Sequence, residues 1–141
     1  MFKKILLPVD LQQPSSWQKA LPTALDYCKA CGAELHLLTI YPNLPLEAYR
    51  LYLPEDTESR LAREAASGLD DFIAEHVPEG VAVFKHVDTG SIYHCILETA
   101  ERIGNDMIVM ASHRPEMSDY LVGPNASRVV RHAKISVLVV R

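Results

Sequence analysis

The chain has 141 residues, a formal net charge of −4 at pH 7 and 48% apolar residues. This length corresponds to one domain, 1–141, that can bury a sizeable core, and the composition is that of a folded soluble protein. The acidic balance argues against a surface that neutralises a nucleic-acid backbone, so no nucleic-acid partner is expected.

Membrane insertion and secretion are not predicted. No apolar run approaches the roughly 20 residues of a membrane span, and the apolar stretch in "MFKKILLPVDL" is too short for a secretion signal. Cys28, Cys31 and Cys95 are odd in number, which excludes a complete set of intrachain disulfides and favours a reducing, cytoplasmic compartment. The pair in "CKAC" closes a predicted helix, which favours ordinary helix-end cysteines over a redox pair or a zinc site.

The first third of the chain predicts a strand, a helix and a strand. Residues 3–9 form a dense apolar run closed by a proline, as in a strand buried on both faces. A helix capped by Ser15 or Ser16 is predicted to end near Gly32, and Pro22 must either kink it or mark its true start. Its expected apolar face consists of Trp17, Leu21, Ala24, Leu25 and Cys28. A second strand is predicted at 33–41.

The alternation continues to the end of the sequence. After a long loop from Pro42 to Thr57, residues 58–76 form the clearest helix, because apolar residues recur there at helical spacing. These residues are Leu61, Ala65, Leu69, Phe72 and Ile73. The remaining elements are predicted as a strand at 81–90, a helix at 91–104 capped by Ser91, a strand at 106–112, a helix at 126–132 and a strand at 134–141.

Strands that alternate with helices in this way predict an α/β fold. The expected architecture is a doubly wound parallel sheet with helices on both faces, because the crossovers are right-handed. Such sheets bind ligands beyond the carboxyl ends of their strands, where the strand order reverses. The candidate loops are "PVDLQQPSS", "TIYPNLP", "DTGS" and "ASHRPEMSDYLVGPNAS".

The loop after the fourth strand has the features of an anion site. It ends at Gly123, where a helix begins with free backbone amides, and His113 and Arg114 could add charge-assisted hydrogen bonds. A glycine before a helix is common and Pro124 is a favoured first helical residue, so an ordinary turn is the alternative. Neither GxxxxGK[ST] nor a GxGxxG after the first strand occurs, so neither a P-loop enzyme nor an ordinary dinucleotide dehydrogenase is supported.

The whole chain resembles the universal stress protein family, and its tail is most similar to the F-type subfamily. The shared motifs are "ILLPVD", "HVDTGS", "ASHRP", "VVRHA" and "SVLVVR", with "YLVGPNA" in place of the subfamily's "YL" followed by "GSNA". The resemblance implies a five-stranded parallel sheet of order 3-2-1-4-5 and a tendency to dimerise. It also implies membership of a family in which one class binds ATP and another does not.

The ATP-binding class of that family has a motif of Gly, two residues, Gly, nine residues, Gly and then Ser or Thr, which falls on 111–125. Here Ala111 replaces the first glycine and Pro124 replaces the Ser or Thr after Gly123. The second glycine is missing: Arg114 follows His113 directly, and only eight residues separate Arg114 from Gly123. Pro124 removes one N–H and one hydroxyl from the expected phosphate position. The donors that remain are Arg114, Asn125 and Ala126.

The resemblance also implies a set of nucleotide contacts. Pro8, Val9 and Asp10 would border the base and the ribose, and Thr39 and Ile40 would meet adenine through their backbone. The ribose and phosphate side would be lined by Ala111, Ser112, His113, Arg114, Gly123, Asn125 and Ala126. Asp10 could equally serve as a cap or turn acceptor, and His113 could be a solvated loop residue.

The leading hypothesis is an ATP-binding stress-response or regulatory protein without fast catalysis, with Mg²⁺ accompanying the nucleotide. One alternative is a slow ATPase in which Asp10 or His113 activates water. Another is an interaction protein that does not use its pocket. No catalytic triad or protein-held metal is predicted. Structural or surface roles, without a matching cluster, are predicted for His36, His76, His86, His94 and His132.

The last strand predicts an assembly. In the strand order of the family it lies at an edge, and no proline or charge interrupts it between Ile135 and Val140. Such an apolar edge exposes unpaired backbone groups, so we expect a homodimer through Ser136 to Val140, which could double into a tetramer. The alternative is a monomer whose last strand is covered by 42–57.

Overall fold

The computed structural model describes residues 1–42, 52–112 and 123–141. Its strands are β1 (Lys4–Pro8), β2 (Glu34–Tyr41), β3 (Val83–Thr89), β4 (Met107–Ala111) and β5 (Ser136–Val140). Its helices are the 3₁₀-helix η1 (Pro14–Ser16) and the α-helices α1 (Ala20–Cys31), α3 (Thr57–His76), α4 (Ile92–Ile103) and α5 (Pro124–His132). The sheet is parallel with the order β3-β2-β1-β4-β5, which confirms the predicted fold.

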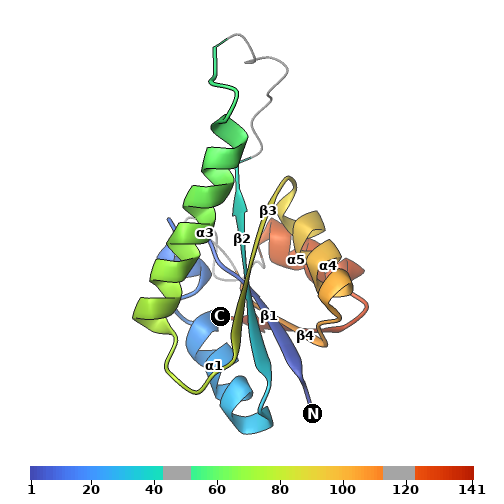
Figure 1. Ribbon diagram of the computed structural model, residues 1–141. Helices are drawn as coiled ribbons and strands as arrows, with labels where there is room; N and C mark the ends of the chain where they lie inside the picture. Colours follow the sequence, from blue (N-terminus) through green and yellow to red (C-terminus); the bar gives the residue numbers. More distant parts are fainter. Residues whose placement is uncertain (43–51, 113–122) are drawn as a thin grey trace.

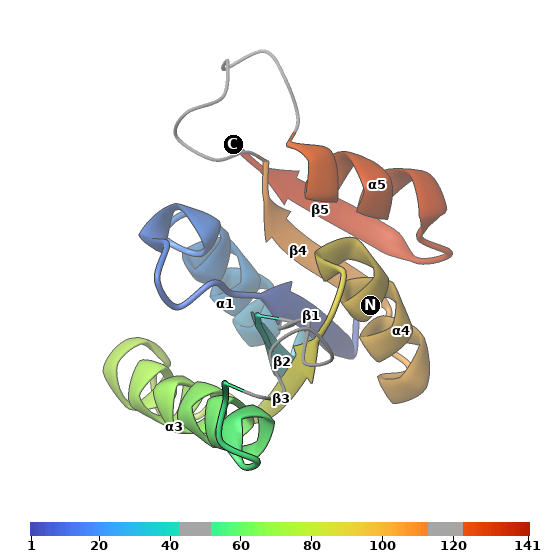
Figure 2. The ribbon, with the colours of Figure 1, turned by 90° about the horizontal axis from the view of Figure 1, so that it is seen from above.

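Two layers of helices enclose the sheet, as Figures 1 and 2 show. Successive residues of β1 face opposite sides, so Ile5 and Leu7 pack in one core with residues of α1 and α3. Leu6 packs in a second core with residues of α4 and α5. The side chains of Ile5, Leu6 and Leu7 are all fully buried. This explains why the first strand has no polar alternation: both of its faces lie against helices.

The first helix begins later than predicted. Ser16 belongs to η1, and its hydroxyl bonds the backbone of Asp10, so neither Ser15 nor Ser16 caps α1. Pro22 lies in the first turn of α1, where backbone amides need no partner within the helix. It therefore marks the start of the helix and does not kink it. Trp17 precedes α1 but still packs against the core, with its ring 5.1 Å from that of Phe72.

The predicted helix ends are largely confirmed. Gly32 ends α1 with a φ of 66°, a left-handed conformation that glycine adopts without strain. Ser91 is the N-cap residue of α4, as predicted, although its side chain makes no capping hydrogen bond. The last helix starts at Pro124, two residues before the predicted boundary.

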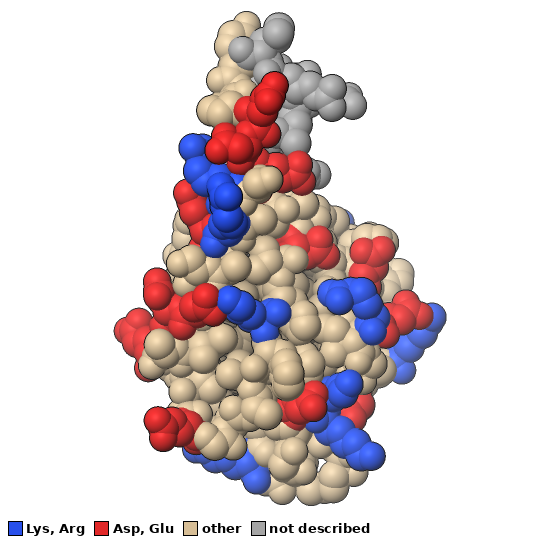
Figure 3. Space-filling view, viewed as in Figure 1, with Lys and Arg blue, Asp and Glu red and all other residues tan. Residues whose placement is uncertain are grey.

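The sheet has two edge strands, β3 and β5. The four apolar residues of β5 are partly exposed, which leaves an apolar edge. None of the described helices is both long and apolar enough to cross a membrane. On the face shown in Figure 3, acidic and basic side chains are mixed over α3 and α4 and do not form a field of one sign.

The environments of the three cysteines predict an order of reaction. Burial raises the pKa of Cys28 to about 11 and that of Cys95 to about 11, with Cys31 adding to the rise at Cys28 and Asp88 to that at Cys95. At pH 8 such thiols are ionised in only about one molecule per thousand. We expect iodoacetamide at pH 8 to modify the partly exposed Cys31 first. Mass spectrometry of peptides from the treated protein measures which cysteine has reacted. In urea all three should react alike; equal rates in the folded protein would contradict these environments.

Candidate functional site

A pocket opens where β1 and β4 part. These strands pair at only two positions, Ile5 with Met107 and Leu6 with Ile108, whereas β1 pairs with β2 along its whole length. Beyond Leu6 the gap is lined by the end of β1 on one side and the end of β4 on the other. This is the position at which the strand order reverses, and open α/β sheets bind ligands there.

Pro8 explains why the pairing stops. In a parallel strand alternate residues bond to opposite neighbours. The Val9 amide donates to the Leu38 carbonyl of β2, and the Lys4 carbonyl accepts from Asp106 beside β4. Pro8 shares the orientation of Lys4, so it faces β4, and it has no N–H to donate. The ladder between β1 and β4 therefore ends at this residue.

The pocket gathers most of the predicted site residues. Those that line it are Pro8, Val9, Asp10, Ile40, Ala111, Ser112, Gly123, Asn125 and Ala126. Thr39 is buried and is not among the lining residues, consistent with its orientation opposite to Ile40 on β2. His113 and Arg114 lie outside the described residues. These nine residues come from separate parts of the sequence and line one pocket, while their roles as nucleotide contacts stay predictions.

The predicted set of site residues did not include the other lining residues, although four of them lie in loops that were predicted as candidates. These are Gln13, Ser15, Ser16, Leu38, Ile92, Ile96, Met110 and Pro124, the last of which was considered only as a replacement in the motif. Strand alternation could have found Leu38, because it is two residues from Ile40. Ile92 and Ile96 lie one helical turn apart on α4, but no local pattern says which pocket a helix face covers.

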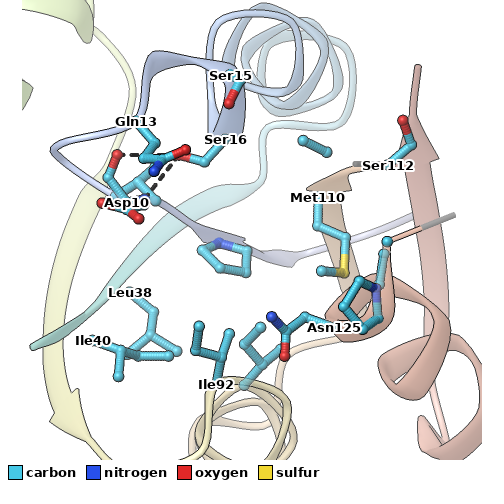
Figure 4. A pocket seen from close by; sticks show the side chains of 17 residues that line it. Asp10, Gln13, Ser15, Ser16, Leu38, Ile40, Ile92, Met110, Ser112 and Asn125 are labelled. Carbon is cyan, nitrogen blue, oxygen red and sulfur yellow. Dashed lines mark hydrogen bonds between the residues drawn. The ribbon is translucent and has the colours of Figure 1, made fainter. Parts of the chain in front are cut away.

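The two sides of the pocket differ in chemistry (Figure 4). Leu38, Ile40 and Ile92 lie along one side, and the polar residues of the loop after β1 lie on the other. Met110 and Ile96 extend the apolar part. An apolar slot of this kind suits a flat aromatic ring, and the polar loop suits groups that form hydrogen bonds.

Asp10 is held by a closed hydrogen-bonded turn. Its backbone N–H donates to Ser16 Oγ at 2.9 Å, and the Ser16 hydroxyl donates to its carbonyl at 3.2 Å. The Gln12 N–H donates to Asp10 Oδ1 at 3.0 Å. The alternative role as a turn acceptor is therefore confirmed. A carboxylate has about four acceptor positions, so this turn still leaves capacity for a hydroxyl or amino group of a ligand.

The amino end of α5 closes the polar side of the pocket. The Gly123 N–H donates to the Ser112 carbonyl, which connects the start of α5 to the end of β4. Pro124 has no N–H, so Asn125 and Ala126 carry the first-turn amides that need partners outside the helix. These amides and the helix dipole favour a negative group. The amide of Gly123 itself is already used in its bond to Ser112.

The described lining residues include one titratable side chain, that of Asp10. Within the described parts of the chain, no group of three or more His, Cys, Asp or Glu residues could hold a metal ion. The described residues of the pocket thus offer a ligand apolar surface, backbone amides and one carboxylate.

Two histidines that were predicted to be isolated form a pair. His36 of β2 and His86 of β3 are joined by ring nitrogens 2.9 Å apart, and Glu34 lies 3.0 Å from the other nitrogen of His36. The prediction that they lack a matching cluster is wrong. Local periodicity does not reveal the register between two strands separated by more than forty residues, which is what brings these rings together.

Replacing Pro8 by alanine tests the cause of the opening. The new N–H at position 8 faces β4, so we expect it to find a carbonyl acceptor there and to exchange slowly with solvent. Hydrogen exchange measured by NMR would show this protection, and Pro14→Ala outside the sheet serves as the control. Rapid exchange at position 8 would mean that packing, and not the missing donor, holds the strands apart.

Comparison with known proteins assigns the chain to a family. The sequence profile of the universal stress protein family matches residues 1–141. Universal stress protein G of Shigella flexneri is 33% identical over 143 aligned positions that cover 100% of both chains. Among solved structures, hypothetical protein MJ0577 has a TM-score of 0.74 at 26% identity. The alignment covers 99% of this chain and 96% of the MJ0577 chain. A universal stress protein in complex with cAMP has a TM-score of 0.63 at 20% identity, with coverages of 99% and 97%, and shows the fold alone. The chain belongs to the universal stress protein family.

Proposed function

We propose that this protein binds an adenine nucleotide, ATP with Mg²⁺, in the pocket between β1 and β4 and acts as a stress-response regulator without fast catalysis. The observation that carries the proposal is the joining of an apolar slot to a helix amino terminus at the point where the strand order reverses. A cytoplasmic location remains a prediction from the odd number of cysteines.

The arrangement of the pocket supports a defined orientation of the nucleotide. The base would occupy the slot beside Leu38, Ile40 and Ile92, where apolar surface is available for a flat ring. The phosphates would lie against the amides of Asn125 and Ala126 at the positive end of α5. Asp10 would then accept a hydrogen bond from the sugar or from the base.

Two further considerations support a nucleotide. The structural neighbour solved in complex with cAMP carries an adenine nucleotide on this fold. Mg²⁺ commonly binds through substrate phosphates and water and needs few protein ligands, which suits a pocket whose described residues contribute one carboxylate. We assign no hydrolytic reaction, because no described lining residue other than Asp10 has a titratable side chain.

Pro124→Ser tests the phosphate position. The variant adds one backbone N–H and one hydroxyl beside the Asn125 amide, so ATP binding should strengthen by about 1 kcal/mol, the value of one or two hydrogen bonds. Titration calorimetry with ATP and with adenosine measures this, and adenosine should gain nothing. Pro78→Ser, outside the pocket, is the matched control.

Two results would count against this assignment. Absence of heat and of a thermal shift with millimolar ATP in the unchanged protein would refute the proposed function. An equal gain for ATP and adenosine in Pro124→Ser would show that the phosphates lie elsewhere.

We further propose that β5 pairs with its symmetry mate in a homodimer. None of the described strands lies beyond β5, and its residues from Val137 to Val140 are partly exposed. An antiparallel copy would satisfy the free backbone groups and cover this apolar edge, and twofold dimers are the commonest soluble assemblies. A tetramer would require a second contact between such dimers.

Val139→Lys tests this assembly without disturbing the interior. Val139 belongs to neither core cluster, so a lysine there should blunt the edge and leave the fold intact. Light scattering should give at least twice the mass of a 15.8 kDa chain for the unchanged protein and a smaller mass for the variant. Phe84→Lys, on the opposite edge strand, should leave the mass unchanged. A monomeric mass for the unchanged protein at micromolar concentration would refute the dimer.

A further inference from the structure

The edge strand β3 is joined to β2 by a chain of three side chains, Glu34, His36 and His86. The two imidazole rings are almost parallel, with an interplanar angle of 15° and centroids 5.2 Å apart. Phe84 stacks on the same His36 ring, also at 15°. His36 is only 5% exposed, so these contacts hold the edge strand against a buried group of its neighbour.

The linked side chains of Glu34, His36 and His86 can hold only a limited number of protons. A hydrogen bond between two ring nitrogens holds one proton, and one of the nitrogens must accept. The Glu34 carboxylate accepts from His36 Nε2, which leaves His36 Nδ1 to share a proton with His86 Nε2. When both rings are fully protonated, two N–H groups face each other and the bond is lost. Acid therefore breaks a contact that neutral solution preserves.

The charged groups around His86 make its protonation unfavourable. Burial lowers the pKa of His86, and the nearby His36 and the Arg102 guanidinium of α4 lower it further. The acidic side chains on these elements have other partners: Glu34 bonds His36, Asp88 of β3 accepts from the Thr89 N–H, and Glu98 of α4 pairs with His94. Lys85, the residue before His86, donates from its Nζ to Asp70 Oδ1 of α3 at 2.6 Å.

The direction of the pH effect follows from that lowered pKa. Below about pH 6.5, the ordinary value for histidine, the unfolded chain binds a proton at this residue more readily than the folded chain does. The stabilisation is therefore present above about pH 6.5 and is lost as the pH falls through the pKa of the folded protein.

The histidine pair adjoins the pocket. In the register of β2 and β3, His86 lies opposite Leu38, and the next residues on that face are Ile40 and Asp88. Leu38 and Ile40 line the apolar side of the pocket. Loss of the bond between the histidines would thus loosen β3 beside the residues on which a base would rest.

We propose that Glu34, His36 and His86 form an acid-sensitive latch that holds β3 against β2 and couples solution pH to the affinity of the pocket. The second half of this statement rests on the proposed nucleotide-binding function. The first half is independent of any ligand, so the two can be tested separately.

Hydrogen exchange tests the latch itself. Protection factors of the β3 amides are measured by NMR at pH 7.5 and 5.5 in the unchanged protein, in His86→Gln and in His94→Gln. Glutamine at position 86 can bond His36 at either pH and does not titrate. We expect protection to fall at pH 5.5 in the unchanged protein and in the exposed-histidine control His94→Gln, and to stay constant in His86→Gln. The same fall in all three proteins would overturn the proposal.

A second variant covers the case in which His86→Gln does not fold. His36→Gln leaves one titrating ring in the pair, so NMR should show the His86 titration midpoint moving up toward its ordinary value. An unchanged midpoint would overturn the proposed pairing.

Nucleotide titrations at the same two pH values test the coupling. The ratio of ATP affinity between the unchanged protein and His86→Gln cancels the protonation of ATP itself, and it should fall by about fivefold at pH 5.5, the lower end of typical coupling between sites. A constant ratio would overturn the coupling while leaving the exchange result to decide the latch. No ATP binding at either pH would refute the proposed function and the coupling, and the exchange measurement would still decide the latch.

Discussion

The interruption of the ladder between β1 and β4 is the constraint on which the site depends. Pro8 faces β4 without a donor, so the two strands separate after Leu6 while Val9 stays bonded to β2. The other wall is fixed just as firmly, because the Ser112 N–H donates to the Val140 carbonyl of β5 and its carbonyl accepts from Gly123. The pocket is thus bounded by backbone that is bonded on its outer sides, which preorganises it for a ligand.

The same separation explains how a small set of residues can serve both ends of a ligand. The apolar side of the pocket continues the core between the sheet and α4, since Ile96 is fully buried there and Leu38 is 1% exposed. The polar side is built from turns whose own hydrogen bonds are already made, as at Asp10 and Gly123. Binding would therefore require little reordering of the described residues, and the conformational entropy lost on binding would be small.

The sequence pattern predicted the elements better than the details of the site, and the strand order came from the resemblance to the family. Dense apolar runs and helical spacing located the strands and helices, because burial on one or two faces imposes those periods. The start of α1 was missed because the Ser16 hydroxyl bonds a residue six positions earlier instead of capping a helix. The histidine pair was missed because it depends on the register of β2 with β3, and the contribution of Ile92 because it depends on helix packing. Both are tertiary facts without a local signal.

The two edges of the sheet differ in a way that suggests different roles. β5 is apolar and partly exposed from Val137 onward, which suits a permanent contact with another chain. β3 instead carries Lys85, which pairs with Asp70, and the histidine pair, so its edge is polar and its attachment depends on protonation. Because Leu38 lies between the histidine pair and the pocket, ligand binding and proton binding would be linked, and the linkage is reciprocal. A ligand that binds more tightly to the latched sheet must lower the proton affinity of His86. The factor is the same as that by which protonation of His86 lowers the affinity for the ligand.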